Sequence, residues 1–208
     1  MRLPLLATVL ALAVPASAQG LCGNGEARMG TAELSVLITD RDPPERPYVR
    51  LQAPGSGNFV LDLTFRTADR KIGAIGVASL RAKVLPGSDR FVQLEWREAG
   101  AAEWFNEGYK FQPRFYPGDP LGHVDTRMGQ GPPLPFRADL LEALQRGTTF
   151  EVRSLTDTGA VIEAGKVALP APALVEQAYA SAYASAMKSL GPCGAPMIIV
   201  PARPPAKS

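Results

Sequence analysis

The chain has 208 residues, of which 46% are hydrophobic and 20% are charged, with 20 glycines and 20 prolines. This length suits one globular domain, and the composition excludes a disordered or collagen-like chain while predicting many turns. Lys and Arg total 22 against 20 for Asp and Glu, a near balance that argues against a nucleic-acid partner bound through phosphate contacts.

The first 18 residues have the pattern of a secretory signal peptide. Arg2 precedes an uncharged, apolar run from Leu3 to Val14, and Ala16–Ala18 forms a small-x-small cleavage site. The run is shorter than the roughly 20 residues that a membrane-spanning helix needs. We therefore expect cleavage near Ala18 and a periplasmic or secreted protein that does not span a membrane. The bulky Leu21 before Cys22 argues against lipid attachment.

Cys22 and Cys193 are the two cysteines of the chain. In an oxidising compartment two thiols of one chain usually pair, and the glycine-rich flanks of both provide flexibility to reach disulfide geometry. The chain-entropy model assigns roughly 5 kcal/mol to a bridge that closes so long a loop. Two thiols without a C-x-x-C motif suit neither redox chemistry nor structural zinc. We expect a structural Cys22–Cys193 disulfide and no metal.

Strands dominate the middle of the chain. Alternating apolar and polar residues or β-branched residues, bounded by Pro/Gly turns, predict strands at period two. The clearest alternation runs from Phe59 to Arg66, where Phe and Leu occupy one face and Val, Asp, Thr and Arg the other. The predicted strands are Thr31–Thr39, Phe59–Arg66, Ile72–Val84, Phe91–Arg97, Glu103–Gln112, His123–Thr126, Thr148–Leu155 and Ala160–Leu169.

Two helices are predicted late in the chain. Arg137–Arg146 carries a leucine stripe and is followed by Gly147, while Pro170–Leu190 begins with prolines and ends at Gly-Pro. Tyr179, Tyr183 and Met187 repeat every four residues, and small residues fill the opposite face. This helix either covers a sheet or forms a homo-oligomer interface.

These elements predict a mainly β fold. We expect an antiparallel sandwich or small barrel, with a short helix and a C-terminal helix packed on it. The single domain is expected to span residues 19–200, and the Pro-rich segment 201–208 is expected to be a disordered tail.

Seven aromatic residues fall between Trp96 and Tyr116. A strand points only alternate residues at the core, so some of them are expected to face elsewhere. Trp96, Trp104, Tyr109 and Tyr116 are the candidate binding residues, because exposed aromatics suit sugars, peptides or protein surfaces. The alternative is that the cluster forms a wall of the core.

Catalytic candidates are few. His123, between Asp119 and Asp125, has the neighbours of a carboxylate-oriented general base, but the sequence lacks a G-x-S-x-G nucleophile elbow. Glu95, Glu103 and Glu107 flank aromatic residues, as glycosidase carboxylates do. No motif indicates a cofactor, and one histidine with two paired cysteines gives no metal site.

The segment from Asp139 to Gly147, the strand Thr148–Val152, a hairpin and an Ala-rich helix resemble the C-terminal part of the invasion-associated locus B family. The resemblance spans about residues 137–187, and the additional paired cysteines expected upstream of that helix are absent. It implies an exported, β-rich bacterial protein with a role at the cell envelope or in host contact. It transfers no catalytic residue.

Three functional hypotheses follow. The first is a non-catalytic exported envelope or interaction protein that contacts a protein or envelope component around Trp96–Tyr116. The second is a carbohydrate-binding module that uses Trp104 and Tyr109 as stacking platforms. The third is a hydrolase built on His123 or on the carboxylates near Trp104. The sequence leaves the ligand and the oligomeric state open.

Overall fold

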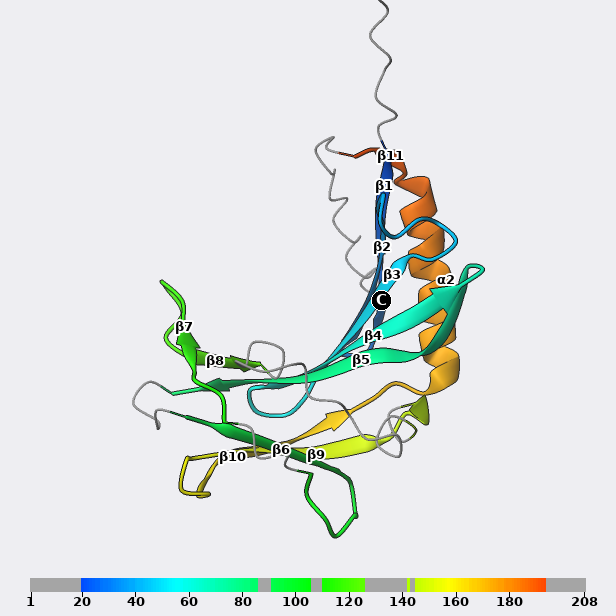
Figure 1. Ribbon diagram of the computed structural model, residues 1–208. Coiled ribbons are helices and arrows are strands. Elements are labelled where there is room, and N and C mark those ends of the chain that lie inside the picture. The colour runs from blue at the N-terminus through cyan, green and yellow to red at the C-terminus, as the bar shows by residue number, and fades with distance from the viewer. Residues whose placement is uncertain (1–19, 86–90, 106–109, 126–141, 143–144, 194–208) are drawn as a thin grey trace, which may run out of the picture.

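A computed structural model describes residues 20–85, 91–105, 110–125, 142 and 145–193 (Figure 1). The expected signal peptide, most of the expected helix 137–146 and the tail 201–208 lie outside these ranges, as do Tyr109 and Glu107. No helix among the described residues is long and apolar enough to cross a membrane.

The larger sheet is antiparallel and has eight strands in the order β11-β1-β2-β3-β4-β5-β8-β7. Consecutive strands from β1 to β5 are neighbours, which is the pattern of a meander. Their bounds are β1 Leu21–Met29, β2 Ala32–Ile38, β3 Tyr48–Pro54, β4 Phe59–Ala68, β5 Lys71–Val84, β7 Arg114–Phe115, β8 Gly122–Asp125 and β11 Gly191–Pro192.

A smaller antiparallel sheet has the order β10-β9-β6, with β6 at Gln93–Glu98, β9 at Thr149–Leu155 and β10 at Val161–Ala168. The larger sheet bends along its length: α2 (Pro172–Lys188) covers β1 and β2, and the smaller sheet packs beneath the β4–β5 end (Figure 1). The predicted fold class is confirmed, since the molecule is mainly β and antiparallel with a C-terminal helix.

Alternation along the strands decides which face of the large sheet is buried. In β2 to β4 every second side chain is apolar and buried, while the residues between them are mostly polar. The buried set meets α2 and the smaller sheet, and we call this the core face. Its largest buried members are Phe59, Leu34, Ile38, Leu51, Leu63 and Leu80. The opposite side, which lines the inner bend, we call the polar face.

The contact between α2 and β1 depends on small residues. A Cβ built on Gly25 would lie 1.9 Å from the carbonyl oxygen of Ala182, and one on Gly23 would lie 2.4 Å from that of Ala186. Both alanines are fully buried. The helix therefore lies directly on the strand backbone, which is possible only because these strand positions lack a side chain.

Two strand predictions differ from the structure. Residues 21–29, where the flank of Cys22 was expected to be flexible, form β1, because pairing with β2 and the close fit to α2 compensate for the poor strand propensity of glycine. The predicted strand Glu103–Gln112 is not formed as a regular strand in its described residues. They make only the isolated bridges Trp96↔Phe105 and Val92↔Phe111, on the side of the edge strand β6 that β9 leaves open.

Candidate functional site

The two cysteines meet where the ends of the domain come together. Cys22 and Cys193 are at disulfide distance, with a Cα–Cα separation of 4.9 Å across 171 positions of sequence. Cys22 lies in β1, whose start pairs with β11 just after α2. The expected pairing is therefore present, and it joins the first strand to the segment that follows the helix.

Trp96 does not belong to a binding surface. Its side chain is only 3% exposed and forms part of the core. Since Trp96 alternates with Glu95 and Arg97 along β6, its ring points inward while those charged residues point to the outer side of the small sheet. The prediction that Trp96 is a binding residue is therefore wrong, and the alternative, that it forms part of the core, is confirmed.

Trp104 lies against two arginines on the outer side of the small sheet. The guanidinium carbon of Arg97 lies 4.4 Å from the centre of the Trp104 ring, and that of Arg153 lies 4.1 Å from it. Each arginine also binds a carboxylate across the β6–β9 pair: Arg97 Nε donates to Glu151 at 2.7 Å, and Arg153 Nε to Glu95 at 2.6 Å. The ring is thus part of a cross-strand charge ladder.

One of the candidate catalytic carboxylates, Glu95, belongs to this set of cross-strand ion pairs. Glu95 is 8% exposed and forms an ion pair with Arg153, so its oxygens are engaged within the sheet. Glu103 is exposed on the loop that follows β6. The two glutamates therefore lie in different environments: Glu95 is buried in an ion pair, whereas Glu103 is exposed.

Tyr116 lies on the other sheet from Trp104, just after β7. It is 44% exposed, and its ring meets the ring of His123 edge-on at 5.1 Å. Neighbouring Phe115 is 52% exposed. The three candidate aromatic residues that the structure describes therefore do not share one surface: Trp96 is in the core, Trp104 covers the small sheet, and Tyr116 borders the polar face.

His123 belongs to a charged cluster beside Tyr116. Its Nε2 lies 2.7 Å from Asp119 Oδ2, and the Nζ of Lys83 lies 3.0 Å from the same oxygen. The backbone N–H of Leu121 donates to Asp119 Oδ1 at 3.0 Å, and this bond, then His123 and Lys83, lowers the pKa of Asp119 well below its usual value. Asp119 thus orients His123, as the sequence indicated. The described contacts of His123 are with Asp119 and Tyr116 and include no nucleophile.

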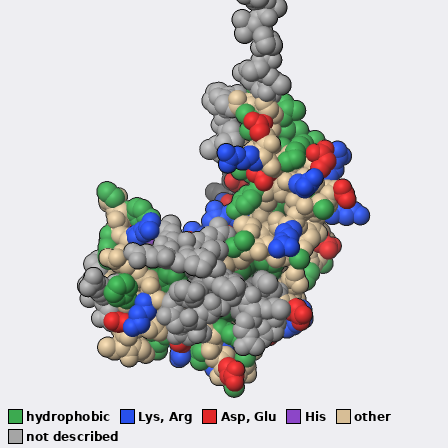
Figure 2. Space-filling view, viewed as in Figure 1, with side chains coloured by type: hydrophobic (Ala, Val, Ile, Leu, Met, Phe, Trp, Pro, Cys, Tyr) green, Lys and Arg blue, Asp and Glu red, His purple; other side chains and the backbone are tan. Residues whose placement is uncertain are grey.

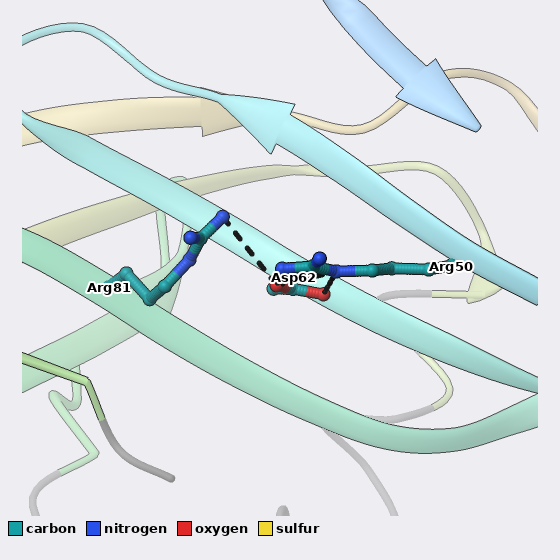
Figure 3. A network of polar contacts seen from close by, with 3 residues as sticks. All are labelled: Arg50, Asp62 and Arg81. Atoms are coloured by element: carbon teal, nitrogen blue, oxygen red, sulfur yellow. Dashed lines mark hydrogen bonds and ion pairs between the residues drawn. The ribbon is translucent and has the colours of Figure 1, made fainter. Parts of the chain in front are cut away.

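A second cluster follows a diagonal across three strands of the polar face (Figure 3). Asp62 of β4 is 1% exposed; Arg50 of β3 donates through Nε at 2.8 Å and through Nη2, and Arg81 of β5 lies 3.5 Å from it. The hydrogen bond to Asp62 raises the pKa of Arg50 above its usual value. The amide of Gln52, which pairs with Asp62 across β3–β4, accepts from both arginines when its oxygen faces them.

The strand register places the two clusters side by side. Arg81 pairs with Asp125 and Lys83 with His123 across β5–β8, and all four side chains line a cavity of about 380 Å³ beside Val60 and Asn58. The Nε of Arg81 is buried and has no hydrogen-bond partner within the described part of the chain. Figure 2 shows Lys and Arg side chains at the inner bend of the molecule. This cavity with its two charged clusters is the candidate site.

Sequence reasoning named only His123 and its acidic neighbours from this site. Arg50, Asp62, Arg81 and Lys83 were not singled out. The alternation of β4 was a usable signal, because it placed Asp62 on the polar face of a strand whose other face is apolar. Its arginine partners could not be inferred without the strand register.

Among the described residues, no group of three or more His, Cys, Asp or Glu side chains has the spacing to hold a metal ion. No family model, no curated protein and no solved structure matches this chain.

Proposed function

We propose that the protein is an exported, non-catalytic binding protein that contacts an envelope component through the polar face of its large sheet. The observation that carries this proposal is the cavity of about 380 Å³ beside β5, β8 and the start of β4, whose lining includes Arg81, Lys83, His123 and Asp125. The leader-like segment at residues 1–18 and the cysteine pair at disulfide distance support export.

The site suits recognition because its charged groups are already held in place. Asp62 fixes the two arginines, and Asp119 fixes Lys83 and His123, so little side-chain freedom is lost when a ligand binds. Small-molecule sites of this size typically combine a concave surface with a few oriented polar groups. The buried Nε of Arg81 adds a donor that suits a ligand oxygen.

A carbohydrate is the ligand class that the surroundings favour within this proposal. Tyr116 and Phe115 are exposed beside the clusters, and an aromatic ring suits the apolar face of a sugar. Arg81, Asn58 and Asp125 supply donors and acceptors for hydroxyl groups. Tyr116 is thus the proposed stacking residue in place of Trp104, whose ring lies against Arg97 and Arg153.

Calorimetric titration with peptidoglycan fragments and neutral oligosaccharides tests the proposal. We expect saturable binding, weakened about tenfold by Lys83→Ala or Tyr116→Ala, the loss of about one good contact. Arg28→Ala is the matched control, since Arg28 is a highly exposed cation on β1 whose carboxylate partner lies 3.6 Å away. Equal affinities for Lys83→Ala and Arg28→Ala would contradict the site. Release of a hydrolysed product would contradict the non-catalytic assignment and favour the His123 hydrolase hypothesis.

A further inference from the structure

Two adjoining cavities lie on the core-face side, between α2 and the β4–β5 hairpin. The inner cavity measures about 330 Å³ and is mostly apolar; its wall includes Leu51, Leu63, Phe65, Ile75, Leu169 and Val175. The outer cavity measures about 440 Å³ and shares Ile72 and Glu176 with the inner one. Both volumes fall within the range of roughly 300–1,000 Å³ that is usual for small-molecule sites.

The hairpin that forms the outer wall has an unusual turn. Asp69 and Arg70 both have positive φ, at 51° and 63°. Such a two-residue turn normally contains Asn-Gly or Asp-Gly, because a side chain strains this conformation. The register of the hairpin also shifts between Thr64 and Thr67. These features end the hairpin with the side chains of Arg70 and Lys71 lining the outer cavity.

Tyr179 of α2 also lines the outer cavity and has an unsatisfied hydroxyl. Its side chain is 6% exposed, and the hydroxyl has no hydrogen-bond partner in the described part of the chain. Burial raises the pKa of this hydroxyl, which therefore stays protonated and able to donate. Tyr183, one turn further, differs because its hydroxyl donates to the carbonyl oxygen of Pro44 at 3.2 Å. An unpaired buried donor is costly, and a ligand oxygen would relieve it.

We propose that these cavities bind a single acyl chain with a carbonyl oxygen at its head. The hydrocarbon chain occupies the inner cavity, where polar lining is limited to Gln145 and Glu176 among the described side chains. The head occupies the outer cavity, where the Tyr179 hydroxyl and the Lys71 ammonium donate to its oxygens.

The charges at the outer cavity are mixed, which defines the head further. Lys71 and Arg70 are cations, Glu176 is an anion, and Arg70 lies 3.8 Å from Glu45. A compact carbonyl or carboxylate head suits this balance better than a large anionic group, which Glu176 and Glu45 would repel. A free fatty acid and a monoacylglycerol share this chemistry.

Displacement of a fluorescent fatty acid from the mature, disulfide-intact protein tests the proposal. We expect oleate and monooleoylglycerol to bind with one-to-one stoichiometry, and dodecyl maltoside, which has a chain but no carbonyl, to bind at least about tenfold more weakly. A fatty-acid head predicts that Lys71→Gln weakens oleate more than monooleoylglycerol. Equal losses for the two ligands would instead indicate a neutral head. Absence of saturable binding by all three probes would overturn the proposal.

Neighbouring positions of α2 offer a matched pair of variants. Val175→Phe adds bulk to the inner cavity, whereas Leu174→Phe adds the same ring at a position that is 48% exposed and lines neither cavity. We expect Val175→Phe to weaken oleate binding about tenfold or more and Leu174→Phe to leave it unchanged. Equal affinities of the two variants would refute the location.

Two further variants protect this test against a folding defect. If Val175→Phe lowers the melting temperature, Ile72→Trp at the shared wall blocks the passage from a partly buried strand position. Tyr179→Phe keeps the ring, so it is expected to preserve folding and to weaken oleate roughly fivefold, the effect of one hydrogen bond. Lys83→Ala lies on the polar face and is expected to leave acyl binding unchanged, which separates this proposal from the proposed function.

Discussion

The two faces of the large sheet are stabilised by different interactions, although the same strands form both. The core face carries apolar side chains and, on β1, the glycines that let α2 approach the backbone. The polar face carries arginines held by Asp62 of a neighbouring strand, and a lysine and a histidine held by Asp119 of the loop between β7 and β8. On the core face, α2 packs directly against the backbone of β1 at two glycines. On the polar face, long charged side chains form ion pairs with carboxylates across the sheet.

This difference separates the contact that positions α2 on β1 from the charged network that can recognise a polar ligand. A backbone-to-backbone contact has no slack, so a single added carbon disturbs it. An ion-pair network can exchange one partner for a ligand group while the strands stay in place. The polar face is therefore expected to tolerate substitution of its exposed residues but not of the buried Asp62, and the contact between α2 and β1 is not expected to tolerate added side chains.

The largest expected effect comes from removing the disulfide at the β1 end of the large sheet. Replacing both cysteines, with Cys22→Ser and Cys193→Ser, removes the link between β1 and the segment after α2. The loop-closure model predicts a loss of about 5 kcal/mol of unfolding free energy. Urea denaturation of the parent and the double variant measures it. A loss below about 1 kcal/mol would show that the helix holds β1 without the bridge.

The next effect comes from the polar face. Asp62→Ala leaves two arginines without their buried carboxylate, and breaking such a pair costs roughly 3–5 kcal/mol. Glu33→Ala is the control, because Glu33 pairs with Arg28 at the exposed surface, where an ion pair contributes about 0–1 kcal/mol. Chemical denaturation compares the two. Equal losses would mean that Asp62 is less important to the fold than its burial indicates.

A smaller effect is expected from Gly25→Ala. The added Cβ would lie 1.9 Å from the Ala182 carbonyl oxygen and 2.7 Å from the backbone nitrogen of Ala186, so the helix must move away from β1. Overpacking of this kind costs roughly 1–3 kcal/mol. Gly191→Ala is the control, since its added Cβ meets nothing within 4 Å. Thermal melting measures the difference, and unchanged melting of Gly25→Ala would contradict the close contact.

How far sequence reasoning reached depends on whether a feature is local. Alternation in Phe59–Arg66 predicted both the strand and its two faces, because period two is visible within eight residues. The turn Thr156–Gly159 likewise marked the β9–β10 hairpin. The small residues of α2 indicated close packing against a sheet, and Ala182 and Ala186 provide it.

Features that depend on distant partners were not predictable. From the sequence, Gly23 and Gly25 predicted a flexible segment. In the structure they allow close packing of a helix that lies some 160 positions later in the chain. Trp96 was compatible with both core and surface, since only the position of the second sheet decides which side of β6 is covered. The candidate site requires the register of β5 with β8, and no short sequence pattern encodes that pairing.

The smallest effect concerns the pH dependence of the polar face. The pKa of Asp119 is lowered in the folded protein, so ionised Asp119 stabilises the fold above its ordinary pKa of 3.8, and this contribution is lost as the pH falls through the lower, folded value. Asp119→Asn removes the ionisable carboxylate and therefore also its pH-dependent contribution to stability. We therefore expect the variant to be slightly less stable than the parent at pH 7, and the difference between their urea midpoints to shrink below about pH 4. Glu33→Gln on β2 serves as the surface-carboxylate control, and a difference that grows on acidification would show that Asp119 does not anchor Lys83 and His123 as its contacts indicate.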